Sequence, residues 1–430
     1  MSENNRNLLI QNGRVIDPSQ GLDIQADVLV SGGRIAQIGP RLSVEAPRLD
    51  AAGWVVAPGF IDLHTHLREP GREHAETIES GGRAAAAGGF TSVLAMPNPR
   101  PVNDCAAVTH LIVQTARQQS PVNVYPVGAI SENSDGERLA PIGEMKEAGI
   151  VAVSDDGRPV MNSDLMRHAM SYACVFGLVV IDHCEDLDLT AGGLVHEGFT
   201  AVRMGLRGIS PSAEEVMVAR DILLAARTGA RFHVAHLSTA GSLEMVREAK
   251  RRGLPVTCEV TPHHFTLTDE DIKDYDTNYK MKPPLRSRAD REALLQGLAD
   301  GAVDAIATDH APHAGSEKMQ EFELAPFGIT GLETALGLAL DRLVHAGHIS
   351  LVRLVELFST NPARIVGLDR GTLKVGAVAD ITLFDPERCW TFDVNQSFSR
   401  SRNTPFHGYS LRSGPVATIV AGHVVWQAGG

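Results

Sequence analysis

The chain has 430 residues, is 43% hydrophobic and 21% charged, and carries 41 glycines, a composition typical of a folded protein with many turns. Its length permits one barrel-sized domain with a smaller one, or about two to three ordinary domains. The formal net charge of -13 argues against nucleic acid or an anionic membrane as a partner, because either would require a basic surface.

Cysteine usage and the first residues bear on the cellular compartment. The 5 cysteines are scattered and form no Cys-x-x-Cys pair, so we expect neither a disulfide framework nor a thiolate metal site. The opening segment MSENNRNLLIQNG lacks a basic stretch followed by an apolar one, and no run of about 18 apolar residues occurs. We therefore expect a cytoplasmic protein without a membrane anchor.

The two ends of the chain have the pattern of a small β-domain. Residues 8–50 and 371–430 contain short strand-like runs separated by Gly, Pro and Asp turns. Because strands at both ends leave edges that can pair, we predict one β-sandwich built from residues 1–54 and 369–430.

Between these ends, residues 55–368 alternate β-branched runs with segments of helical spacing, which is the pattern of repeated β-α units. Eight runs predict eight parallel strands within residues 55–66, 89–98, 123–130, 149–157, 177–186, 231–238, 255–264 and 302–313. Helices are expected at 104–119, 162–177 and 240–253. The sequence therefore predicts the α/β class, with a closed (β/α)8 barrel of the TIM type beside the small β-sandwich.

Polar side chains gather at the predicted carboxyl ends of these strands. The first strand ends in His64 and His66, with Arg68 two residues further on, and in an extended chain these three side chains share one face. The other strands end in Asn98, Asp155, Asp156, His183, His236, Asp309, His310 and His313. Active sites of such barrels lie at the carboxyl face, so we expect these residues to converge.

Four histidines and two carboxylates around one point form a set of nitrogen and oxygen ligands that favours zinc over manganese, cobalt or iron. Six ligands exceed what one tetrahedral ion needs, so we predict two ions. The predicted ligands are His64, His66 and Asp309 for one ion and His183 and His236 for the other, with Asp155 or Asp156 as a bridge. Such a pair of ions polarises a carbonyl and generates hydroxide near neutral pH, as amide hydrolysis requires. Asp309 is the predicted general acid/base.

Other histidines favour structural interpretations. His233 lies three residues before His236 and, by strand alternation, is expected to face outward beneath a helix. His263 and His264 end the seventh run, where a helix start is a better interpretation than a place around the metal.

Several segments together resemble the dihydroorotases of the amidohydrolase superfamily, whose fold is a metal-dependent hydrolase barrel. The similar stretches are DLHTHLREPG, VSDDG, HCED, AHLST, ATDHAPHAGSEK and APFGITGLETA, and they span nearly the whole chain. Asp309, His313 and Lys318 have the spacing of the family's second signature. Related hydantoinases and allantoinases use a carboxylated lysine on strand four, whereas residues 150–156 contain no lysine. The resemblance is therefore to the bacterial (class I) type, in which an aspartate bridges the metals, and it selects Asp156 as that bridge.

This resemblance implies reversible hydrolysis of the cyclic amide of (S)-dihydroorotate to N-carbamoyl-L-aspartate, run toward ring closure in pyrimidine (UMP) biosynthesis, with one or two zinc ions. The planar fork of Arg68 would grip the substrate carboxylate. Where the family commonly has KMNPPLR, this chain has KMKPPLR, so Lys282 takes the place of a substrate-binding asparagine. The implied substrate contacts are His66, Arg68, Asn98, Lys282, His313, Phe327 and Gly328.

Two alternatives remain open on the sequence alone. One is a hydantoinase- or allantoinase-like cyclic amidase, because one barrel supports many substrates. The other is a non-catalytic scaffold for aspartate transcarbamoylase, although such a scaffold would be expected to lose metal ligands. An active enzyme could also associate with that transferase, and a homodimer is the default expectation.

Overall fold

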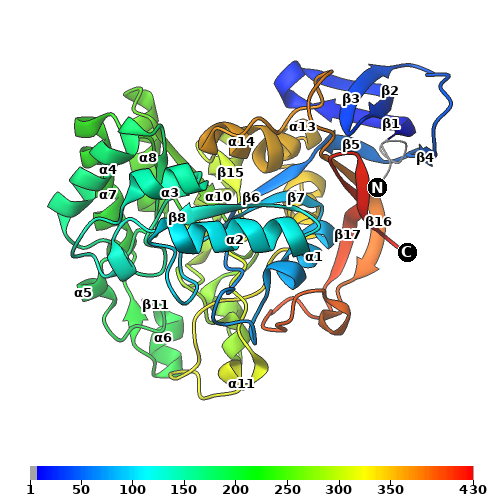
Figure 1. Cartoon of the computed structure of the whole chain (residues 1–430). Coiled ribbons are helices and arrows are strands. Elements are labelled where there is room, and N and C mark those ends of the chain that lie inside the picture. Colours follow the sequence, from blue (N-terminus) through cyan, green and yellow to red (C-terminus); the bar gives the residue numbers. More distant parts are fainter. Residues whose placement is uncertain (1–6, 430) are drawn as a thin grey trace.

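The computed structural model describes residues 7–429, so residues 1–6 of the predicted N-terminal β-domain lie outside the described part. Two large sheets organise the fold, one a barrel wrapped by helices and the other a β-domain at one side of it (Figure 1). Among the described residues, none of the helices combines the length and apolarity that a membrane crossing requires.

The barrel contains 8 parallel strands, which follow one another around the sheet in chain order. Their bounds are β6 (Phe60–Thr65), β7 (Phe90–Ala95), β8 (Asn123–Gly128), β9 (Ala152–Val153), β10 (Val179–Asp182), β13 (Phe232–Val234), β14 (Val256–Val260) and β15 (Ala305–Ile306). Each predicted run contains one of these strands, so the predicted barrel class is confirmed. A parallel bridge between Thr65 and His310 brings β15 back to β6 and nearly closes the barrel.

Asp62 reinforces this closing seam. Its Oδ1 accepts hydrogen bonds from the backbone N–H of Thr308 at 3.0 Å and of His64 at 3.1 Å. Its other oxygen lies 2.5 Å from the hydroxyl of Thr308. Because Asp62 is completely buried, its pKa is raised to about 7.

Helices cover the outside of the barrel. The larger ones are α1 (Ile78–Ala87), α2 (Ala106–Gln119), α3 (Ile142–Ala148), α4 (Ser163–Val175), α7 (Ser212–Thr228), α8 (Ala240–Arg251) and α10 (Arg288–Asp300). Shorter helices are α5 (Leu187–Thr190), α6 (Phe199–Met204), α9 (Pro262–Thr266), α11 (Gly315–Lys318), α12 (Ala335–Ala339), α13 (Leu351–Val355) and α14 (Asn361–Val366). The predicted helices at 104–119, 162–177 and 240–253 correspond to α2, α4 and α8. A two-stranded sheet of β11 (Val195–His196) and β12 (Gly208–Ile209) lies beside α6.

The strands are apolar on both faces, as a covered parallel sheet requires. Phe90 and Phe232 belong to the core between the strands and the helices, whereas Leu63, Val179 and Ala305 belong to a separate cluster inside the barrel. Because the interior is filled with side chains, the polar groups of the strands are concentrated at the carboxyl ends.

Strands from both chain ends form the β-domain, as predicted. Its sheet has the order β18-β17-β16-β5-β1-β2-β3, with β4 paired to β1. The bounds are β1 (Leu8–Asp17), β2 (Leu22–Ser31), β3 (Arg34–Gly39), β4 (Arg48–Asp50), β5 (Val55–Pro58), β16 (Ile381–Thr391), β17 (Ser410–Val420) and β18 (His423–Gln427). Figure 1 shows the blue N-terminal and red C-terminal strands side by side. The domain boundaries near residues 54 and 369 stay a prediction.

Candidate metal centre and substrate cavity

A cavity of about 280 Å³ lies at the carboxyl ends of the barrel strands. It is lined by His66, Arg68, Asn98, Asp156, Gly157, His183, His236, Lys282, Asp309, Ala311, His313, Phe327 and Gly328. The predicted ligands and substrate contacts thus lie around one space, except His64, which is completely buried beneath it. Segments after β6, β7, β9, β10, β13, β14 and β15 bring them together. Asp155 and His310, which were also expected to converge here, do not line the cavity: Asp155 accepts hydrogen bonds from the backbone of Ile130 and Ser131, and His310 contacts Glu76.

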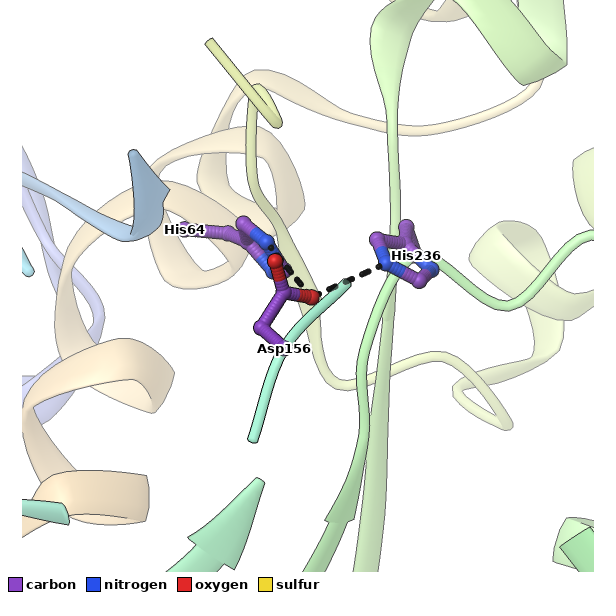
Figure 2. Close-up of side chains that lie close together, drawn as sticks. All are labelled: His64, Asp156 and His236. Carbon is purple, nitrogen blue, oxygen red and sulfur yellow. Dashed lines mark ion pairs between the residues drawn. The ribbon is translucent and has the colours of Figure 1, made fainter. Parts of the chain in front are cut away.

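Asp156 lies between the four histidines. Its Oδ1 is 3.2 Å from His64 Nε2 and 3.6 Å from His236 Nε2, the two contacts drawn in Figure 2. The same oxygen is 3.8 Å from His183 Nδ1, while Oδ2 is 3.4 Å from His66 Nε2. One carboxylate therefore has imidazole nitrogens facing both of its oxygens, which is the arrangement that a bridging ligand requires.

Asp309 completes the side of the site that holds His64 and His66. Its Oδ1 lies 3.1 Å from His66 Nε2 and 3.6 Å from His64 Nε2. Two ligands on one tetrahedral ion, each about 2.0–2.1 Å from it, are about 3.3 Å apart. The spacing of these donor atoms therefore fits a shared ion.

Unpartnered atoms also fit a cation. Among the described residues, His64 Nε2 and Asp156 Oδ1 are buried side-chain atoms without a hydrogen-bond partner, although they face each other. Donor atoms within 4.8 Å of one another form two sets, His64 with His66 and Asp309, and His64 with Asp156 and His236. A cation between these atoms would satisfy them, so the residues form a candidate metal centre.

The surroundings of Asp156 and Asp309 lower the pKa values of both carboxyl groups and so favour their charged forms. Burial alone would raise the pKa of Asp156, but the charge of His64 and contacts with the other histidines hold it well below its usual range. Burial likewise opposes ionisation of Asp309, but contact with His66 and the charges of His64, His66 and His236 together outweigh it, so the pKa of Asp309 is also lowered. Both groups are therefore carboxylates near neutral pH and can bind a metal or accept a proton.

Glu259 on β14 is a residue that the sequence prediction missed. Its Oε1 lies 3.3 Å from His64 Nδ1, and its Oε2 lies 3.1 Å from His233 Nε2. Glu259 and His233 are both completely buried. His233 therefore contacts the groups beneath the metal centre, and the prediction that it faces outward is wrong.

Backbone conformation explains that error. His233 and Ala235 point inward by alternation, and His236 would then point outward. The backbone of His236, with a φ of 33°, leaves the strand conformation and turns the ring into the cavity. Asp309 (φ 47°) and Arg68 (φ 61°) also have left-handed backbones. Arg68 consequently reaches the cavity through a turn after β6, and not through continued strand alternation.

Glu185 is a second missed residue. Its Oε2 lies 2.9 Å from His183 Nε2, which leaves His183 Nδ1 facing Asp156 and 2.9 Å from His236 Nε2. A carboxylate on the outer nitrogen of a metal-binding histidine fixes the orientation of the ring. The signal was in the sequence, because Glu185 is two residues after His183 in the HCED segment and on the same strand face.

Lys282 is engaged with the protein. Its Nζ donates a hydrogen bond to Glu185 Oε1 at 2.7 Å and lies 5.0 Å from the centre of the Phe327 ring. Asn98 is engaged as well, because its Oδ1 lies 2.9 Å from His66 Nδ1 and its Nδ2 donates to the carbonyl of Asp156. Both side chains line the cavity while they orient metal-centre residues.

Arg68 and His313 both line the cavity. Arg68 is 8% exposed, and its Nε donates to the carbonyl of Pro312 at 3.1 Å. His313 Nε2 donates to the Phe327 carbonyl at 2.8 Å. Burial and the charge of Arg68 lower the pKa of His313 to about 3, so its ring is neutral. Within residues 7–429, Nδ1 has no hydrogen-bond partner, and Glu317 Oε2 lies 3.6 Å from it.

Two buried lysines hold the segment that carries Phe327 and Gly328. Lys318 Nζ donates to the carbonyls of Pro326 at 2.9 Å and Gly328 at 3.1 Å. Lys280 Nζ donates to the carbonyls of Phe322, Glu323 and Ala325. The cavity wall that Phe327 and Gly328 form is thus anchored by the two lysine side chains.

His263 and His264 lie in α9, in agreement with the predicted helix start.

Solved structures with this architecture include hydantoinases and dihydropyrimidinases. An L-hydantoinase (dihydropyrimidinase) from Arthrobacter aurescens is 27% identical and aligns over 99% of this chain and 97% of its own with a TM-score of 0.89. A D-hydantoinase from a Bacillus sp. AR9 is 28% identical and covers 98% and 95% with a TM-score of 0.85. The fold and the site together define a hydrolase of the amidohydrolase type.

Sequence comparisons narrow this class. Residues 53–242 match the family model described as dihydro-orotase-like. A dihydroorotase of Solibacter usitatus is 60% identical over 421 residues, 98% of either chain, and one of Geobacter sp. strain M21 is 54% identical over 425 residues, covering 98% of this chain and all of the relative. The chain belongs to the dihydroorotase family.

Proposed function

We propose that this chain is a zinc-dependent dihydroorotase that interconverts (S)-dihydroorotate and N-carbamoyl-L-aspartate in pyrimidine (UMP) biosynthesis. The observation that carries the proposal is Asp156 between four imidazoles, with Asp309 and Arg68 at the same cavity. The 60% identity to a dihydroorotase over nearly the full length supports the substrate.

His64, His66, Asp156, His183, His236 and Asp309 would hold one or two zinc ions, since a nitrogen and oxygen donor set without thiolate suits zinc. When bound, zinc supplies Lewis-acid polarisation of the amide carbonyl and activation of water near neutral pH. His64 and Asp156 are buried, and electrostatic interactions are stronger there than in water.

Asp309 is the proposed general acid/base. As a carboxylate with a lowered pKa beside His66, it accepts a proton from the attacking water and passes it to the leaving ring nitrogen. In the direction of ring closure the same carboxylate removes the proton from the ureido nitrogen. One group thus serves both directions, as microscopic reversibility requires.

Substrate binding follows from the remaining wall. The guanidinium of Arg68 grips the carboxylate of the substrate, and Asn98 and His66 lie beside it. His313, whose ring is neutral, accepts a hydrogen bond at Nδ1 from a ring N–H. The backbone of Phe327 and Gly328 contacts the other edge, and Lys282 contributes through Glu185 or by direct contact.

The alternatives have less support. A hydantoinase-like amidase agrees with the fold of the solved structures, but these are 27% and 28% identical, well below the dihydroorotases. A non-catalytic scaffold for aspartate transcarbamoylase does not require six converging metal-ligand residues. We keep association with that transferase, a homodimer and a cytoplasmic location as proposals that co-elution, solution mass and cell fractionation test.

The deciding experiment is hydrolysis of dihydroorotate by the purified protein, compared with hydantoin and allantoin, with bound metal counted on the same samples. We expect activity on dihydroorotate that disappears on chelation and returns with zinc. Faster turnover of hydantoin or allantoin would contradict the assignment. Bound metal without turnover of any of the three would indicate another substrate or a missing partner.

A further inference from the structure

A second cavity, of about 330 Å³, adjoins the substrate cavity. The two cavities share Arg68, Asn98, Asp156 and Gly157 in their walls. The other lining residues of the second cavity, which we name the vestibule, are Arg72, Pro99, Arg100, Val102, Asn133, Ser134 and Arg158. These residues belong to the loops after β6, β7, β8 and β9, so the vestibule lies at the barrel mouth beside the metal centre.

The vestibule is strongly basic in a chain of net charge -13. Four of its lining side chains are guanidinium groups, and its one lining carboxylate, Asp156, faces the metal histidines. Arg72 is paired with Glu317 at 2.9 Å. Arg100 and Arg158 are exposed, and neither has an ion pair with any residue between 7 and 429. Two cations thus face this space without a protein counter-charge.

Holding these cations together is costly. Arg68, Arg72, Arg100 and Arg158 all line this one space, so their like charges repel one another. Arg68, Asn133 and Ser134 also have left-handed backbones, with φ of 61°, 54° and 51°. Such strain tends to persist where function requires the geometry. An anion in the vestibule would offset the repulsion.

We propose that the vestibule is an anion-capture site that favours the dianionic open-chain substrate over the monoanionic ring. The inference rests on the proposed function, because hydrolysis of the cyclic amide converts one carboxylate into two: dihydroorotate and water give N-carbamoyl-aspartate and a proton. Fixed cations attract a ligand in proportion to its charge, so the binding free energy that they supply is about twice as large for the dianion. In ring closure the vestibule therefore gathers the substrate and holds the product less strongly.

The test is the double variant Arg100→Gln with Arg158→Gln, neither residue being part of the catalytic centre. A matched control is Arg252→Gln, an exposed arginine that follows α8 at the opposite, amino-terminal end of the barrel. A second double variant, Arg100→Lys with Arg158→Lys, keeps the charge. KM is measured with N-carbamoyl-aspartate and with dihydroorotate in zinc-loaded enzyme.

Because the attraction is proportional to ligand charge, the variant should change KM for the dianion more than KM for the monoanion. If the double glutamine variant raises KM for dihydroorotate about threefold, it raises KM for N-carbamoyl-aspartate about tenfold, the square of that factor. The equilibrium constant belongs to the two small molecules alone, so kcat/KM must fall by one common factor in both directions. The lysine variant restores both KM values. Added salt reduces the preference for N-carbamoyl-aspartate over dihydroorotate more in the wild type than in the glutamine variant.

Equal rises of KM for the two substrates, unchanged KM values, or the same effect in Arg252→Gln would overturn the capture site. Failure of the lysine pair to restore KM would overturn it as well. The wild-type enzyme tests the proposed function separately, because an enzyme that does not turn over dihydroorotate fails before any variant is compared.

Discussion

The two halves of the candidate metal centre are supported in different ways. The inner group, His64, His66 and Asp309, is backed by Glu259, which is fully buried and contacts His233. The outer group, His183 and His236, is backed by Glu185, whose other oxygen pairs with Lys282, a side chain that is 26% exposed.

Hydrogen bonding of the rings does not separate the two groups, because His64 Nδ1 and His236 Nδ1 both lack a hydrogen-bond partner among the described residues. Both supporting carboxylates are buried, but the contacts behind Glu185 reach water through Lys282, and ligands with a fully buried support bind a metal more tightly. The inner group should therefore bind its ion more tightly, and the outer group should fill only at higher metal concentration.

The largest expected effect comes from the chemistry of the inner group. Asp309→Asn should lower kcat by about 10²- to 10⁴-fold, because the amide cannot move the proton. His64, His66 and Asp156 remain, so the inner ion should be largely retained. Turnover and bound metal are measured on the same sample, and near-normal turnover with intact metal would remove Asp309 as acid/base.

A matched pair of variants tests the expected difference in metal affinity between the inner and outer groups. Glu259→Gln and Glu185→Gln make the same change behind His64 and His183, and each should weaken metal binding about 10- to 100-fold. A titration against a competing chelator should show Glu259→Gln weakening the tighter phase and Glu185→Gln the weaker one. The reverse assignment, or a single phase in the wild type, would contradict the comparison.

A smaller effect is expected at Lys282. Lys282→Asn introduces the residue that the family commonly has, and it removes a partly exposed ion pair, so the weaker metal phase should shift by less than about tenfold. KM for dihydroorotate should change little if Lys282 acts through Glu185. A large rise in KM with unchanged metal binding would instead identify Lys282 as a direct substrate contact.

The smallest expected effect is on the pH dependence of stability and involves Asp62, which links β6 to Thr308 where the barrel closes. The pKa of Asp62 is raised to about 7, so between about pH 4 and pH 7 the folded protein keeps a proton that the unfolded chain has lost. This group therefore makes stability fall as pH rises through that range. Asp62→Asn keeps the contacts to Thr308 without titrating, so its urea midpoint should depend less on pH than that of the wild type at equal metal loading. Identical pH slopes would contradict the assigned pKa.

The strands and most converging residues were predictable because both depend on local sequence. Runs such as that around Phe90 and Val93 have the apolar, β-branched pattern of a buried strand, and polar residues directly after a strand must lie at its carboxyl end. The support behind the ligands was not predictable in this way. Glu259 and His233 lie on neighbouring strands, and their contact depends on register between β13 and β14.

Backbone turns set a second limit. Alternation describes a strand only while it is extended, and His236 adopts a left-handed φ just beyond the end of β13. The sequence does not mark this change, because histidine is not a residue that demands such a backbone. The sequence showed that Lys282 replaces the asparagine common in the family. Its pairing with Glu185 was not predictable, because it joins loops that are far apart in the chain.

The pairing of β5 with both β1 and β16 has a consequence for synthesis. The N-terminal strands leave the ribosome first, and the edge of β5 stays open until the entire barrel has been translated and β16 emerges. Closure of that edge is therefore a late event that follows synthesis of the barrel. A truncated polypeptide would carry an exposed strand edge and would be a ready substrate for chaperones or a nucleus for aggregation.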